Sequence, residues 1–281
     1  MADEYINLVE YGKGLSDPLS SGLIQQFGME SDVLTAIGFK TANQGRNIFE
    51  RETAEPTVAF RAINADPEIS HGETEERQDQ CYPISGLLEY DIVKLMRYGE
   101  GKRALEYEQI MRKGSAVWTD TFISGDNGSD PKEFDGIQNR FVADAAGNVD
   151  GSTDDSRLLA NATGSGGGAL SLAKLDLSID LVNRPTHILM SRRMKTKCRA
   201  AARDPALTNQ AVNITNDMDS DLGRPVMRYN GIPILTGYEA SKRSLFLPFN
   251  EVAHGGGSAV TSSIYVVSFR EDGVCGIHTA P

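Results

Sequence analysis

The chain is poor in cysteine and in long apolar runs, and both scarcities exclude classes of protein. Its three cysteines, Cys81, Cys198 and Cys275, are far apart among the 281 residues and fit neither a disulfide framework nor a zinc motif, so we expect buried, reduced thiols. No apolar run reaches the roughly 18 residues that a membrane-spanning helix needs. Residues 1–14 have neither the basic start nor the apolar stretch of a secretion signal. The sequence therefore predicts a soluble protein without a membrane partner.

Basic side chains are scarce in the N-terminal third, so the formal net charge of −11 is unevenly distributed. Residues 1–85 contain 15 acidic and 6 basic side chains, a net charge of −9, whereas the remaining residues contain 24 acidic and 22 basic ones, a net charge of −2. This sign argues against a protein that coats nucleic acid through phosphate contacts. It still permits a protein that lies beside nucleic acid without sequence-specific contact.

Motifs for catalysis, cofactors or metals are nearly absent. Gly164, Gly166 and Ala169 have the spacing of a dinucleotide-binding loop, but the buried strand before it and the acid about 20 residues after it are missing. A flexible linker is the better interpretation of this Gly-rich segment. Cys275 and His278 form one pair, whereas a zinc site needs further ligands. We therefore expect no catalytic residues, no cofactor and no metal, and hence not an enzyme.

The N-terminal segments suggest protrusions. Residues 1–45 contain two small apolar clusters separated by Gly and Ser, which predicts an arm with one or two short helices that cannot bury itself. In residues 46–85, the strand patterns at 46–52 and 57–63 predict a β-hairpin. The acidic segment 66–80 is then expected to form its tip, which is either solvated or in contact with a basic partner.

A long amphipathic helix is predicted over residues 101–124. Small and apolar side chains recur there every three or four positions and share one face, which we expect to pack on a sheet. At 1.5 Å per residue the helix would be about 36 Å long. Gly125 is well placed as a left-handed cap. The residues of this face are Ala104, Tyr107, Met111, Gly114, Trp118 and Thr121.

The C-terminal half alternates short helices and strands irregularly, which predicts an α+β fold. Asn230-Gly231 between two apolar runs is the strongest short hairpin signal in the chain. A short helix at 86–98, a linker at 142–168, helices at 170–183 and 192–203, and strands at 186–190, 225–229, 232–235, 245–247, 264–269 and 274–278 complete the prediction.

The helix at 192–203 carries six basic residues. Contact with nucleic acid is one interpretation. Pairing with acidic side chains of the same or another chain is favoured, because residues 1–85 supply them. The six basic residues are Arg192, Arg193, Lys195, Lys197, Arg199 and Arg203.

In their order along nearly the whole chain, these segments resemble the major capsid protein of tailed bacteriophages, which has the Hong Kong 97 (HK97-like) fold. No single motif decides the resemblance; the order of the segments does. Besides the helix at 101–124 and the acidic hairpin, it rests on Phe49-Glu50-Arg51, Val58–Asn64, Phe134-Asp135-Gly136-Ile137, His187–Ser191 and Tyr229–Ile234.

The resemblance implies a division of the chain into parts. In this family the chain usually continues as a further strand, so either a C-terminal segment beyond Pro281 is missing from these residues or the family's last strand is supplied differently. The implied parts are an N-terminal arm (1–45), an extended β-hairpin loop (46–85), a peripheral domain with the long helix as its spine (86–141), an axial domain (142–255) and C-terminal strands that return toward the peripheral domain (256–281).

The resemblance also implies a structural function. The chain would self-assemble into hexamers and pentamers of an icosahedral shell around double-stranded DNA, in the virion capsid, after assembly in the bacterial host cytoplasm. Scaffolding, portal and decoration proteins would be further partners. An encapsulin-type compartment, which has the same fold and encloses cargo enzymes, is the alternative, and the long arm favours the phage capsid. The expected intersubunit contacts are Glu73, Glu75, Glu76, Arg192, Arg193, Lys195 and Arg199.

Overall fold

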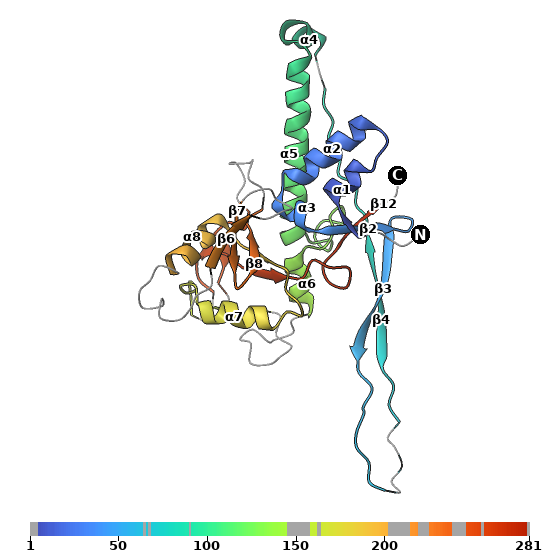
Figure 1. The fold of residues 1–281 in the computed structure, drawn as a ribbon, viewed down its shortest axis with the longest axis vertical. Helices are drawn as coiled ribbons and strands as arrows, with labels where there is room; N and C mark the ends of the chain where they lie inside the picture. The colour runs from blue at the N-terminus through green and yellow to red at the C-terminus, as the bar shows by residue number, and fades with distance from the viewer. Residues whose placement is uncertain are drawn as a thin grey trace.

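The computed structural model has a mixed α+β architecture with several small sheets, which confirms the predicted class. In Figure 1 the long helix α5 and the hairpin β3–β4 leave the body in opposite directions along the longest axis. The structure describes residues 5–63, 66, 69–89, 91–144, 158–161, 164–201, 214–218, 225–237, 246–253 and 256–279.

One part of the body is a five-stranded sheet with the order β11-β5-β8-β7-β6, in which only the β5–β8 pair is parallel. The predicted hairpin at Asn230-Gly231 is confirmed, with φ values of 48° and 81° at the turn. Helices α7 and α8 contribute Leu175, Met194 and Cys198 to the core of this part. The bounds are α7 (Leu172–Asp180), β5 (His187–Leu189), α8 (Arg192–Ala201), β6 (Ile214–Met218), β7 (Pro225–Tyr229), β8 (Ile232–Leu235) and β11 (Tyr265–Val267).

Both helices follow a serine cap: α8 starts at residue 192, as predicted, whereas α7 starts two residues after the predicted start at 170. The hydroxyl of Ser171 accepts from the backbone N–H of Lys174 at 3.4 Å, and that of Ser191 accepts from Met194 at 3.2 Å. The strand expected at 245–247 is wrong for its two described residues, which lie in a bend. Arg203 and most of the 142–168 linker lie outside the described residues. A small sheet of β9 (Glu251–Val252) and β10 (Ala259–Thr261) was not predicted.

The N-terminal segment is folded into the body, so the expectation of an arm that cannot bury itself is wrong. Val33, Leu34 and Ile37 are at most 1% exposed and lie in one core cluster with side chains of α5. The reason is that α5 supplies, within the same chain, the apolar surface on which the segment packs. The bounds are β1 (Ile6–Asn7), α1 (Leu8–Lys13), α2 (Pro18–Met29), α3 (Asp32–Ala36) and β2 (Gly38–Ala42).

The C-terminal strand β12 (Gly276–Thr279) completes a three-stranded sheet with the order β1-β2-β12. It runs parallel to β2, and Gly276 is the partner of Phe39. The first and last described strands of the chain therefore belong to one sheet, beside the base of the hairpin in Figure 1.

The long helix is confirmed as α5 (Glu100–Ser124), but only its C-terminal half is buried. The buried residues are Ser115, Ala116, Thr119, Phe122 and Ile123. The whole Ala104–Trp118 face was expected to be packed, and this is wrong, because the first turns of α5 are exposed. A periodic pattern shows which residues share a face of a helix, but it does not show whether another element covers that face. The helix expected at 86–98 is α4 (Ile92–Tyr98), and residues 86–89 are not helical.

Gly125 ends α5 without a left-handed conformation, so the predicted cap is wrong. Its φ is −59°, and the small residue is needed because a Cβ there would overlap the carbonyl oxygen of Phe134. Gly136 approaches from the next turn, and its N–H donates to the carbonyl oxygen of Gly125 at 2.8 Å. Helix α6 (Ile137–Asp144), which was not predicted, starts immediately after this contact.

Replacing Gly136 with alanine is expected to lower the free energy of unfolding by about 1–3 kcal/mol, the usual cost of overpacking. The new Cβ would lie 2.7 Å from the backbone N of Gly125 and the carbonyl oxygen of Ile123, so the backbone must shift. Urea denaturation measures the change.

The matched control is Gly22→Ala in α2, where the added Cβ would have no atom within 4 Å apart from its chain neighbours and the backbone of its own helix. It is expected to raise stability by about 0.5–1 kcal/mol, because alanine favours helix more than glycine does. Equal effects of the two substitutions would refute the proposed close approach at Gly136.

Candidate functional site

The hairpin leaves the body as a two-stranded antiparallel ribbon of β3 (Arg46–Ala54) and β4 (Glu73–Gln80) (Figure 1). Its register runs from Arg46 opposite Gln80 to Ala54 opposite Glu73. The expectation that the acidic segment 66–80 forms the tip is therefore wrong in part, since residues 73–80 form the second strand. The alternation at 57–63 predicted a strand, but the described part of the chain forms none there.

Four large apolar side chains among the described residues near the end of the hairpin are open to solvent. Val58, Phe60, Ile63 and Ile69 are each at least 84% exposed. We call these four residues the apolar tip. Exposed aliphatic and aromatic side chains gathered on one protrusion indicate an interaction site rather than a solvated loop.

The two faces of the ribbon differ in charge. Opposite residues of an antiparallel pair share a face, and so do residues two apart on one strand. Glu50 lies opposite Glu76, and Glu52 follows on the same face. We call these three residues the acidic face. Like charges directly opposite each other destabilise a strand pair, so this face carries an unfavourable energy that a basic partner would relieve.

The other face of the ribbon includes Glu73 and Glu75, and it is partly neutralised. The guanidinium of Arg77 forms an ion pair with Glu75, with 3.2 Å between Nη2 and Oε2. Because both side chains are about half exposed, the pair contributes little to stability. The predicted contacts Glu73, Glu75 and Glu76 are therefore exposed but divided between the two faces.

The hairpin is fastened to the body at its base. Arg140 of α6 pairs with Asp79, with 2.7 Å between Nη2 and Oδ1. The N–H of Cys81 donates to the carbonyl oxygen of Gly45 at 2.9 Å. These contacts fix where the ribbon starts and leave its outer part without a described contact to the body.

A second apolar protrusion lies at the other end of the molecule, where α4 meets the start of α5 (Figure 1). We call residues 87–105 the α4–α5 end. The α4–α5 end contains four basic and three acidic residues, and the ammonium of Lys102 lies 4.8 Å from the ring centroid of Tyr98. Sequence reasoning missed this site, although Ile92, Val93 and Met96 have helical spacing without an obvious partner. Its exposed apolar residues include Leu87, Ile92, Val93, Met96 and Leu105.

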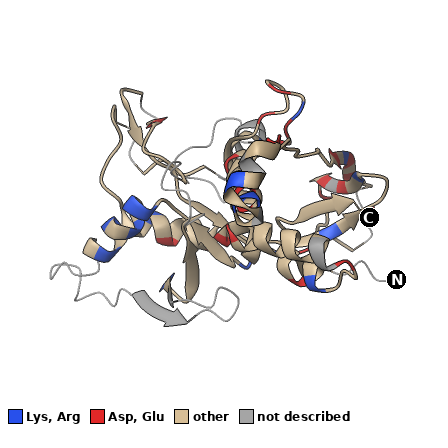
Figure 2. Ribbon diagram, turned by 90° about the horizontal axis from the view of Figure 1, so that it is seen from above, with Lys and Arg blue, Asp and Glu red and all other residues tan. Residues whose placement is uncertain are grey.

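The basic residues predicted as contacts lie on α8 at the side of the body, well away from the hairpin, and Figures 1 and 2 show this separation. Arg192, Arg193 and Arg199 are exposed, and Lys195 is half-buried. The guanidinium carbon of Arg193 and the ammonium of Lys197 lie 4.7 Å and 5.2 Å from the ring centroid of Phe249. Both cations therefore contact an aromatic ring of their own chain. The structure thus does not bring the predicted acidic and basic contacts together within one chain.

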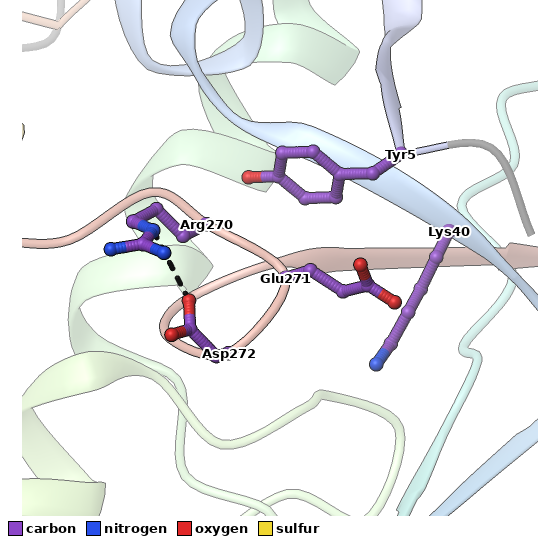
Figure 3. A pocket seen from close by; sticks show the side chains of 5 residues that line it. All are labelled: Tyr5, Lys40, Arg270, Glu271 and Asp272. Carbon is purple, nitrogen blue, oxygen red and sulfur yellow. Dashed lines mark ion pairs between the residues drawn. The ribbon is translucent and has the colours of Figure 1, made fainter.

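An open pocket lies between the first strands and the loop before β12 (Figure 3). The hydroxyl of Tyr5 accepts from the N–H of Gly38 at 3.2 Å, and burial raises the pKa of this phenol. The lining contains two basic and two acidic side chains, so its formal net charge is zero. Its lining consists of Tyr5, Lys40, Arg270, Glu271 and Asp272, and Arg270 pairs with Asp272 at 3.2 Å.

The cysteines show no reactive environment. All three are free, and burial raises the pKa of Cys198 to about 11 and also raises the pKa values of Cys81 and Cys275. Since the thiolate is the nucleophile, these thiols are poorly reactive near neutral pH. The Gly-rich loop has no strand in the described residues 158–161 before it, and the N–H of Gly166 donates instead to the carbonyl oxygen of Gly256 at 2.9 Å.

Comparisons with family models, with curated proteins and with solved structures found no match to this chain. Within the described residues, no group of three His, Cys, Asp or Glu side chains could hold a metal ion. No helix in the described ranges is long and apolar enough to cross a membrane. The apolar tip and the α4–α5 end are the candidate functional surfaces because of their exposed apolar side chains.

Proposed function

We propose that this chain is a structural subunit that assembles with copies of itself into hexamers and pentamers of an icosahedral shell around double-stranded DNA, as tailed-phage capsid proteins do. The apolar tip is the observation that carries the proposal. Its four large apolar side chains are exposed at the far end of a ribbon that has no core of its own. Ordering such a segment costs conformational entropy, and burial against a neighbouring copy would offset that cost.

In this proposal each part of the fold has a role in the shell. The hairpin is the extended loop, α5 is the spine of the peripheral domain, and the five-stranded sheet with α7 and α8 is the axial domain. The exposed cations of α8 would face acidic side chains of other subunits. Scaffolding, portal and decoration proteins would be additional partners, and the packaged DNA would lie nearby without sequence-specific contact.

Negative-stain microscopy combined with analytical ultracentrifugation tests the proposal directly. We expect closed particles, or free hexamers and pentamers, above a threshold protein concentration. A protein that stays monomeric at every concentration and salt condition would contradict self-assembly. A single small oligomer that never grows would contradict the shell.

An encapsulin-type compartment is the second candidate function. It is retained because the N-terminal segment is helical and not an extended arm. The expected extended arm at residues 1–45 favoured the phage capsid over the compartment. Since the segment contains α1, α2 and α3, that argument no longer separates the two functions. Particles purified from the native source that contain DNA would support the capsid, whereas particles that contain an enzyme would support the compartment.

Reversing Glu73, Glu75 and Glu76 to lysine is expected to impair assembly more than folding. These side chains are exposed on a ribbon, so their substitution should change the free energy of unfolding by less than about 0.5 kcal/mol per site. Particle yield and thermal unfolding of the same preparation measure the two effects. An equal loss of both would refute an intersubunit role for this strand.

A further inference from the structure

We propose that the Gly-rich turn and the β9–β10 sheet form a strap, which opens and closes while the rest of the subunit stays folded. The turn comprises residues 164–168, and the second half of the strap comprises residues 251–261. The two halves are far apart in the sequence and meet in the structure. Opening of the strap is a property of the single chain, so it does not depend on the proposed shell.

The two halves of the strap meet backbone to backbone. The N–H of Gly166 donates to the carbonyl oxygen of Gly256 at 2.9 Å. A Cβ on Gly257 would lie 2.6 Å from Oγ of Ser165 and 2.8 Å from the backbone N of Gly166. This approach leaves no room for a side chain at position 257, where a φ of 103° also favours glycine.

A flexible linker is the competing interpretation of the glycines in the turn. Such a linker behaves as a random coil and has no fixed neighbour. Here the side chain of Asn161 holds the end of the turn, because its Nδ2 donates to the carbonyl oxygens of Gly168 and Ala169 at 3.3 Å and 2.6 Å. Its Oδ1 accepts from the N–H of Ser171, the N-cap of α7, at 3.0 Å. The turn is therefore tied to the start of a helix.

The second half of the strap has its own anchors at its base. The hydroxyl of Ser262 donates to the carbonyl oxygen of Leu247 at 2.9 Å. Phe249 and Ile264, on either side of the β9–β10 sheet in the sequence, pack against the core that α7 and α8 share with the five-stranded sheet. Neither half depends on the other for its attachment, so the contact between them can break without detaching either one.

Few buried contacts hold the strap closed. None of the described residues between 248 and 264 is buried, and residues 164–168 are exposed or half-buried. Strands β9 and β10 have two and three residues, and their register shifts between Ala259 and Thr261. A two-stranded sheet alone is marginally stable, and regions with few buried apolar contacts open at a lower free energy than the whole fold. We therefore expect both halves to open together, well before global unfolding.

Opening would change the surface that the subunit presents to a partner. The N–H of Gly166 and the carbonyl oxygen of Gly256 would become free for another chain, and Val252 and Val260, which are 62% and 56% exposed, would move with the sheet. The two core clusters contain no described residue of the strap, so they would stay intact. A partner that binds one of the two forms better would shift the population toward it.

Hydrogen exchange of the full-length chain, measured by mass spectrometry of its peptides, tests the strap. We expect peptides from 164–171 and 251–261 to show the same protection, weaker than that of strands β5 and β8. Protection equal to that of these strands would place the strap in the core. No protection would indicate a flexible linker, and unequal protection would indicate two independent segments. Each of these three results would overturn the proposal.

Gly257→Ala is expected to open the strap, because its Cβ would overlap the turn. Exchange in both peptides should become at least about tenfold faster, the factor that a loss of about 1.4 kcal/mol produces, while β5 and β8 stay unchanged. Gly256→Ala also has a positive φ, but its Cβ would meet no atom within 4 Å outside its chain neighbours, so its effect should be smaller. Gly164→Ala has neither feature and should behave as wild type. Equal effects of the substitutions at 256 and 257 would overturn the close contact.

Asn161→Ala keeps the proposal testable if the Gly257→Ala protein does not fold. The side chain of Asn161 is exposed, and its loss should release the turn and leave the core intact. We expect faster exchange in residues 251–261, on the other side of the contact. Faster exchange confined to the start of α7 would show a local capping role only, and it would overturn the coupling between the two halves.

Discussion

Replacing Phe60 with aspartate is expected to abolish self-assembly while leaving the folded subunit as stable as before. Phe60 is fully exposed at the apolar tip, so the single chain loses no packing when the ring is removed. In the proposed assembly the ring would be buried, and its loss would cost about 1.5–3 kcal/mol at each contact, a factor of roughly 10 to 150. An unpaired carboxylate buried in its place adds a further penalty.

Sedimentation velocity measures assembly, and urea denaturation of the monomer measures stability. The matched variant is Phe60→Leu, which keeps an apolar side chain at the tip and should still assemble. Normal particles from the Phe60→Asp protein would show that the tip stays in solvent after assembly, and the proposal would then lose the observation on which it rests. A large drop in monomer stability would instead mean that the tip packs within its own chain.

The elements that sequence reasoning predicted correctly are those encoded by neighbouring residues. Asn230-Gly231 specifies a tight turn by itself, because both residues adopt positive φ readily. Ser191 marks the predicted start of α8 through a hydroxyl that reaches the backbone three residues later. The start and end of α5 follow equally from a continuous periodic pattern. These signals need no knowledge of distant contacts.

The errors concern what covers a segment, which local patterns do not encode. A strand was predicted at 57–63 because apolar and polar residues alternate there. That rule applies to strands that have one face packed on a core. The hairpin has no core side, so its second strand could form instead from the polar residues 73–80. In the same way, nothing in residues 33–39 reveals that α5 will cover them.

The candidate site was predicted in part. The acidic residues of the hairpin were identified from their charge, but their division between two faces depends on the register with β3. The α4–α5 end was missed because its apolar residues resemble those of any short amphipathic helix. Only the fold shows that Ile92, Val93 and Met96 remain exposed instead of packing on the body.

Replacing Leu34 with alanine is expected to lower the free energy of unfolding of the isolated subunit by about 2–5 kcal/mol, the usual cost of a cavity in a packed core. Leu34 is 0% exposed and packs in the cluster that joins α3 to α5. Domains of this kind are stable by only about 5–15 kcal/mol, so the loss would be a large share of the total. An arm that lies on a neighbouring subunit predicts no such loss in a monomer.

Urea denaturation in the Phe60→Asp background makes the measurement, because that variant is expected to stay monomeric and so excludes any contribution from neighbours. Met29→Ala is the matched control in the same N-terminal segment; Met29 is 62% exposed, and its truncation should change stability by less than about 0.5 kcal/mol. If Leu34→Ala were as mild as its control, residues 33–37 would not belong to the core of the single chain. The burial of this segment would then arise only on assembly, as the extended-arm interpretation requires.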